Sequence, residues 1–196
     1  MIRLTIVAAA ALALGACADS NAPTAASTSP RGPSAAASRG LDVASDDNQR
    51  TVKIFDGCDP ATFNAAIGDP NTCVKKGPIT FDHFVAELQR AQSAPQWRFA
   101  TSEIELAPGA ALQALNEGGE VHTFTRVANF GGGILPLLND LAGTPDVAPE
   151  CTTLEADDFV ASGATYTAEL NGDQLQKIQC CIHPWMRATV RLKSGN

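Results

Sequence analysis

The sequence predicts an all-β sandwich that carries a helical extension before it and a long irregular insertion within it. Apolar and polar residues alternate in 103–106, 164–170 and 188–193, which is the pattern of strands that bury one face in an antiparallel sandwich. Turn-forming pairs at 108–109 and 171–172 lie between such segments. These observations place the sandwich in residues 97–196.

The N-terminus resembles a bacterial lipoprotein signal. Arg3 precedes a short apolar run, and the run ends in Leu-Gly-Ala before Cys17. A basic start, a short apolar core and small residues before a cleavage point are typical of secretory signals. We therefore expect residues 1–16 to be a signal peptide. Cys17 would be lipidated and would anchor the protein to the bacterial cell envelope, on its periplasmic or extracellular face.

Residues 17–50 are rich in Ala, Ser, Pro and Gly and show no apolar period. Such a segment buries too little apolar surface to offset the entropy lost on ordering, so we expect a disordered tether. The net charge of −7 argues against a nucleic-acid partner, because phosphate binding needs an excess of Lys and Arg.

Residues 51–96 are expected to form a helical extension packed on the sandwich. Asp59 is a suitable N-cap, with Pro60 at the first helical position and Gly68 after the last. A second helix is indicated at 81–88, where apolar residues recur every three or four positions.

A long insertion interrupts the strand pattern at residues 128–160. It contains three consecutive glycines and several prolines, and one helical turn is expected around 137–141.

The cysteine count leaves one thiol unpaired. An exported protein folds where disulfides persist, and Cys58 and Cys73 bracket the first predicted helix closely enough to pair. With Cys17 lipidated, the remaining cysteines number five, so one thiol is left over if the others pair. These five are Cys58, Cys73, Cys151, Cys180 and Cys181.

The chemistry is concentrated in residues 180–186. Cys180, His183 and Met186 lie at C-x2-H-x2-M spacing just before a predicted strand. A thiolate, an imidazole and a thioether form a soft ligand set that suits copper. A second imidazole would come from His122, after a Gly-rich turn, rather than from His83 on the second predicted helix.

Residues 180–186 and the strand after them resemble the C-terminal ligand loop of cupredoxins, above all the short-loop amicyanin type. The segment Asn116-x5-His122 is similar to the one that carries the first histidine in that family. The resemblance covers residues 97–194 and implies a Greek-key β-sandwich with one type 1 (blue) copper. It also implies that His122, Cys180 and His183 are the equatorial ligands and that Met186 is the weak axial ligand.

The sequence departs from the family pattern in three places. The insertion lengthens the segment between His122 and Cys180, Thr123 replaces an asparagine that supports the thiolate in many members, and Cys181 is an extra cysteine. Because neighbouring residues in a strand point to opposite faces, Cys181 would be free to pair with Cys151. Cys58 would then pair with Cys73, and Cys180 would remain the free thiol.

The resemblance implies a single-electron carrier rather than an enzyme, with a redox protein as partner. His183 is expected near the protein edge, with Pro184 and Trp185 forming an apolar docking surface around it. The alternatives are a copper-binding or copper-delivery lipoprotein without a redox partner, a structural module that has lost its metal, a structural zinc site, and a hydrolase that uses a Cys–His pair.

Overall fold

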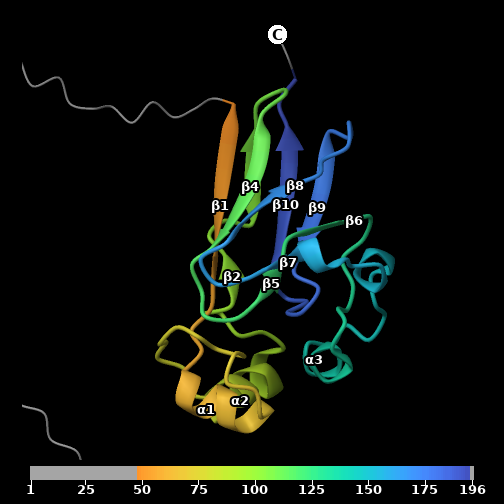
Figure 1. Cartoon of the computed structure of the whole chain (residues 1–196). Coiled ribbons are helices and arrows are strands. Elements are labelled where there is room, and N and C mark those ends of the chain that lie inside the picture. The colour runs from red at the N-terminus through yellow and green to blue at the C-terminus, as the bar shows by residue number, and fades with distance from the viewer. Residues whose placement is uncertain (1–47, 195–196) are drawn as a thin grey trace, which may run out of the picture. The chain divides into compact units, whose positions relative to one another are not determined.

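The computed structural model describes residues 48–194 (Figure 1). The predicted signal peptide, Cys17 and nearly all of the predicted tether lie outside these residues. Most of the regular structure is β-strand, arranged in two four-stranded sheets, and the helices are short. The predicted all-β sandwich with short helices is therefore present. No helix in this part of the chain is long and apolar enough to cross a membrane.

The first sheet has the strand order β2-β1-β4-β8. Its members are β1 (Gln49–Phe55), β2 (Arg98–Phe99), β4 (Ala111–Asn116) and β8 (Thr165–Ala168). In β4 every second residue is buried, so one face of the strand packs against the core.

The second sheet has the strand order β3-β10-β9-β6. Its members are β3 (Glu103–Leu106), β6 (Thr125–Val127), β9 (Leu175–Gln179) and β10 (Arg187–Leu192). A small separate pair is formed by β5 (His122–Thr123) and β7 (Phe159–Val160). The segment 180–186 is the connection from β9 to β10.

Both sheets are mixed, which differs from the expected antiparallel pairing. β1 runs parallel to β4, and β3 runs parallel to β10. The expected boundary of the helical extension also shifts, because residues 51–55 belong to β1 and form an integral strand of the first sheet. This parallel pairing carries the residues after Phe55 to the turn that follows β4, where the backbone N–H of Glu117 donates to the carbonyl of Ile54 (2.9 Å).

The two helices of the extension form where the sequence predicts them. α1 (Pro60–Ile67) is capped by the Asp59 side chain, which accepts the N–H of Thr62, and ends at Gly68 in the left-handed conformation. α2 (Phe81–Ala91) buries Phe84 and Leu88. Figure 1 shows α1 and α2 together beyond the end of β1, at the same end of the sandwich as β5 and β7.

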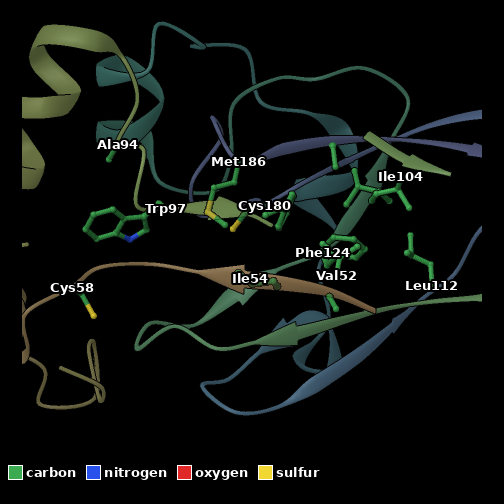
Figure 2. Close-up of a cluster of buried hydrophobic side chains, with 14 of the residues drawn as sticks. Val52, Ile54, Cys58, Ala94, Trp97, Ile104, Leu112, Phe124, Cys180 and Met186 are labelled. Atoms are coloured by element: carbon green, nitrogen blue, oxygen red, sulfur yellow. The ribbon is translucent and has the colours of Figure 1, made fainter. Parts of the chain in front are cut away.

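One hydrophobic core joins the sandwich and the helices. It includes Ile104 and Leu112 from the sheets, Leu88 from α2, and Trp97 and Cys180. Figure 2 shows Ile104, Leu112, Trp97 and Cys180 among the buried side chains. Trp97 is 1 % exposed and lies against Phe84, with ring centroids 4.4 Å apart. The helical extension is therefore packed into the same core as the residues near the C-terminus.

The insertion contains α3 (Pro136–Leu141) and two 3-10 turns, at Pro149–Thr152 and Ala156–Asp158. Both expected disulfides are present, Cys58–Cys73 and Cys151–Cys181. The second of them ties the insertion to the residue beside Cys180.

Candidate metal centre

Three metal-ligating side chains meet in the interior at the end of the sandwich. His122, Cys180 and His183 are all buried, and their potential ligand atoms lie within 4.8 Å of one another. The Sγ atom of Cys180 is 3.8 Å from Nδ1 of His122 and 3.8 Å from Nδ1 of His183. Cys180 is the free cysteine of the described residues.

The cluster depends on two connections of different length. Cys180 directly follows β9, and His183 lies three residues later, in a tight loop closed by a bond from the Met186 N–H to the His183 carbonyl (2.9 Å). His122 begins β5, some 58 residues before Cys180. A backbone bond from Cys180 N–H to the Met186 carbonyl (3.0 Å) keeps Met186 beside Cys180, and Figure 2 shows the two side chains next to each other.

Both histidines use their second ring nitrogen to contact a carboxylate. Nε2 of His122 lies 3.1 Å from Oδ2 of Asp56, and Nε2 of His183 lies 3.5 Å from Oε2 of Glu120. A proton on Nε2 in each ring leaves the Nδ1 lone pair directed at the cluster. The carboxylates therefore select the tautomer that can bind a metal ion through Nδ1.

Asp56 lies just after β1 and is held by several donors. Its Oδ1 accepts the N–H of Gly119 (3.0 Å), and its Oδ2 accepts the N–H of Glu120 (2.9 Å) as well as the contact from His122. Burial alone would raise the pKa of Asp56, but these hydrogen bonds outweigh it and lower the pKa to about 2. A Cβ at Gly118 would overlap the Asp56 carboxylate, so this turn requires glycine.

The charges within the cluster support a thiolate. Burial would raise the pKa of Cys180, but hydrogen bonds from the two histidines outweigh it and hold the pKa well below the usual thiol value. Burial would lower the pKa of His122, yet its bonds to Asp56 and Cys180 raise it to about 9. Both shifts favour a thiolate at Cys180 and a proton shared between His122 and its neighbours, with Asp56 behind the ring.

Thr123 is hydrogen-bonded to both Cys180 and Cys181. Its backbone N–H donates to Sγ of Cys180 (3.4 Å), and its Oγ1 accepts the N–H of Cys181 (2.8 Å). Thr123 therefore supplies a backbone donor to the thiolate and a side-chain acceptor to the next residue of the loop. Asn116 braces the turn before His122, because its Nδ2 donates to the carbonyls of Glu120 (2.7 Å) and Val160 (2.8 Å).

The exposure of the loop differs from the sequence expectation. His183 is 3 % exposed, Pro184 is buried and Trp185 is half-buried, so they form no exposed apolar surface. The ring centroid of His183 lies 6.4 Å from that of Trp97 and 5.4 Å from that of Trp185, and the Trp185 ring in turn contacts Phe84 of α2. The helical extension therefore covers the histidine that was expected at the edge.

Asp56, Glu120 and Trp97 belong to the site although no local sequence pattern indicates them. Trp97 donates its indole N–H to Glu120, which in turn contacts His183. Asp56 and His122 are 66 residues apart, so no local spacing could have linked them. His83, the rejected alternative ligand, lies on α2 beside Glu87 at 3.6 Å, and its side chain is 57 % exposed.

The fold and the donor set define a β-sandwich protein with a buried His–Cys–His cluster that can hold one metal ion. No protein-family model and no curated protein matches the sequence.

Solved structures of cupredoxins align with part of the chain. A mutant amicyanin in its Cu(I) form is 17% identical, with a TM-score of 0.34, over 49% of this chain and 73% of its own. A purple cupredoxin from Nitrosopumilus maritimus is 14% identical, with a TM-score of 0.35, over 51% and 86%. Oxidised plastocyanin from Dryopteris crassirhizoma is 12% identical, with a TM-score of 0.37, over 74% and 100%.

Proposed function

We propose that this protein holds one copper ion in a type 1 site and carries single electrons in the bacterial cell envelope. His122, Cys180 and His183 would be the equatorial ligands, and Met186 would be the weak axial ligand. The observation that carries the proposal is the convergence of two imidazole Nδ1 atoms on one buried thiol, each at 3.8 Å. Thiolate and imidazole donors in this combination suit copper, which would supply a one-electron redox couple.

Residues around the cluster orient the donor atoms in the metal-free protein. Asp56 and Glu120 hold the histidine rings with Nδ1 facing the thiol, and Thr123 donates its N–H to that thiol. Binding a metal ion through Nδ1 would displace a proton from His122, because its bonds to Asp56 and Cys180 raise its pKa to about 9. The loop 180–186, the turn before His122 and the adjoining strands are hydrogen-bonded to one another. Few atoms would therefore need to move when the charge at the site changes.

Burial favours electron transfer over copper delivery. Handing copper to another protein requires incoming ligands to reach the ion, and all three donor residues are at most 3 % exposed. Trp185 is half-buried and lies beside His183. A redox partner would therefore dock where Trp185 reaches the surface. The redox protein partner and the lipid anchor at Cys17 remain parts of this proposal.

Spectroscopy on the exported full chain tests the proposal. On addition of Cu(II), we expect an intense visible thiolate-to-copper band that Cys180→Ser abolishes. His122→Gln should also abolish it, whereas the matched variant His83→Gln should keep it, because His83 lies outside the cluster. A colourless copper-loaded protein, or equal losses in the two histidine variants, would refute the type 1 site. Fast exchange of bound copper with a chelator would favour the delivery function.

A further inference from the structure

Exposed apolar side chains are concentrated on the insertion 128–160. The insertion is less than a quarter of the described chain, yet it holds five of the nine large hydrophobic residues that are exposed among the described residues. Soluble proteins keep exposed apolar patches small, so a concentration of this kind indicates an interaction surface. The five residues are Ile134, Leu135, Leu137, Val147 and Phe159.

Four of these side chains belong to one continuous part of the insertion. Ile134, Leu135 and Leu137 are neighbours at the start of α3, and Leu137 is 68 % exposed. Val147 forms an isolated bridge with Gly132, two residues before Ile134, so its backbone lies beside the same segment. We call Ile134, Leu135, Leu137 and Val147 the insertion face.

The insertion also carries the net negative charge of the described chain. It contains six acidic residues and no Lys or Arg, whereas the other described residues include eleven acidic and eleven basic ones. Lys177 and Arg187 reach the insertion, but they donate to the carbonyls of Ala128 and Gly131. None of the ion pairs among residues 48–194 involves a carboxylate of the insertion. These carboxylates are therefore available to the cations of a partner.

The charge of the insertion face decides between its possible occupants. Asp140 on α3 and Asp146 beside Val147 are both exposed. A second copy of this chain would bring like charges together, and an anionic lipid surface would be repelled. A protein with an apolar patch bordered by Lys and Arg would match both the apolar side chains and the carboxylates.

The insertion face adjoins the ligand loop. The N–H of Ile134 donates to the carbonyl of Cys181 (2.7 Å), the residue after Cys180. Leu137 also lines a cavity of about 490 Å³ whose lining includes His183. A protein seated on the insertion face would therefore lie near the metal donors.

We propose that the insertion face is the docking surface for a basic redox protein whose apolar contact patch is bordered by Lys and Arg side chains. The apolar patch packs on the insertion face, and the cations lie opposite Asp140 and Asp146. The contact region then extends from the ligand loop, which includes Trp185, on to the insertion. That the partner exchanges electrons rests on the proposed function, whereas the docking itself needs no copper.

Cytochrome c is the probe, because it is a small redox protein whose exposed haem edge is surrounded by lysines. In an NMR titration of the isotope-labelled, metal-free exported chain at low ionic strength, we expect saturable shifts at the insertion face. The affinity should fall steeply as salt is added, because salt screens the attraction between surface charges. Cytochrome c with succinylated lysines should not bind, because its positive charge is lost.

Two pairs of charge variants test where the cations dock. Asp140→Asn combined with Asp146→Asn should weaken binding at low ionic strength by about fivefold. Glu103→Gln combined with Glu169→Gln is the matched control, because these exposed residues lie outside the insertion and the net charge changes equally. The control should bind cytochrome c almost as well as the wild-type protein.

Two leucine variants test the apolar part of the contact. Leu137→Ser should weaken binding by about tenfold, because a central apolar side chain contributes much of the energy of an interface. Leu175→Ser is the matched control, since Leu175 is 50 % exposed on β9, and it should leave the affinity unchanged.

Absence of saturable binding, shifts confined to residues outside the insertion, or equal losses in the test and control variants would overturn the inference. In copper-loaded protein, electron transfer to cytochrome c should slow in the aspartate and Leu137 variants alone. A missing visible band in the wild-type protein would refute the type 1 site but not the docking surface, because docking is measured without metal.

Discussion

The loop 180–186 and the segment 49–97 contribute to the same site in different ways. The loop brings a thiol and an imidazole together within a few residues, and its chemistry can be recognised from local spacing. The N-terminal segment supplies no donor to the cluster, yet it supplies Asp56, Phe84 and Trp97, which orient and cover the histidines. The comparison shows that ligand identity is local in this protein, whereas ligand orientation and burial come from a distant part of the chain.

Removing the Trp97 side chain should disrupt the packing of the N-terminal segment over the histidines. Trp97 is 1 % exposed and packs against Phe63 and Phe84, so Trp97→Ala should lower the free energy of unfolding by about 3–5 kcal/mol. Urea denaturation measures this loss. Trp97→Phe is the control: it keeps most of the packing and loses the hydrogen bond to Glu120, so its effect should be clearly smaller. Equal effects would show that packing is not the main contribution.

The two disulfides allow each region to be loosened separately. Cys151→Ser combined with Cys181→Ser opens a loop of 30 residues beside the ligand loop and should cost about 3–4 kcal/mol. Cys58→Ser combined with Cys73→Ser opens a loop of 15 residues in the N-terminal segment and should cost about 3 kcal/mol. Thermal unfolding compares the two. We expect only the first pair to alter the copper spectrum strongly, because Cys181 adjoins Cys180.

Asp56 links the two regions through its charge. Its pKa is lowered from 3.8 to about 2 in the folded protein, so its contribution is complete above pH 4 and is lost as the pH falls through about 2. The shift corresponds to about 2 kcal/mol. Denaturation of metal-free protein between pH 2 and 5 should show this decline, and Asp56→Asn should remove most of it. An unchanged acid profile in the variant would assign the decline to other carboxylates.

Thr123→Val should have the smallest effect. The variant keeps the backbone N–H that donates to Cys180 and loses the hydroxyl that accepts the Cys181 N–H, so we expect a loss of about 1 kcal/mol. The visible band should shift only slightly. Thr123→Ser is the matched control, because it retains the hydroxyl and should leave both measurements close to wild type.

The sequence alone determined the residues that carry the chemistry and much of the local structure. The spacing of Cys180 and His183 places two donors on one short loop, and the caps at Asp59 and Gly68 define α1. Alternation predicted β3, β8 and β10, because period and turn residues act over a few positions. It did not reveal that β1 is part of the sheet, because its parallel partner β4 is more than fifty residues away along the chain.

Only the tertiary structure decided how the donors are held and covered. Asp56 reaches His122 because β1 pairs with β4 in parallel, and His183 is buried because α2 and Trp97 pack over the loop. Contacts between residues so far apart depend on the pairing of strands and the closing of one core. Neither leaves a periodic or short-range signal in the sequence, so they become visible only when the chain is folded.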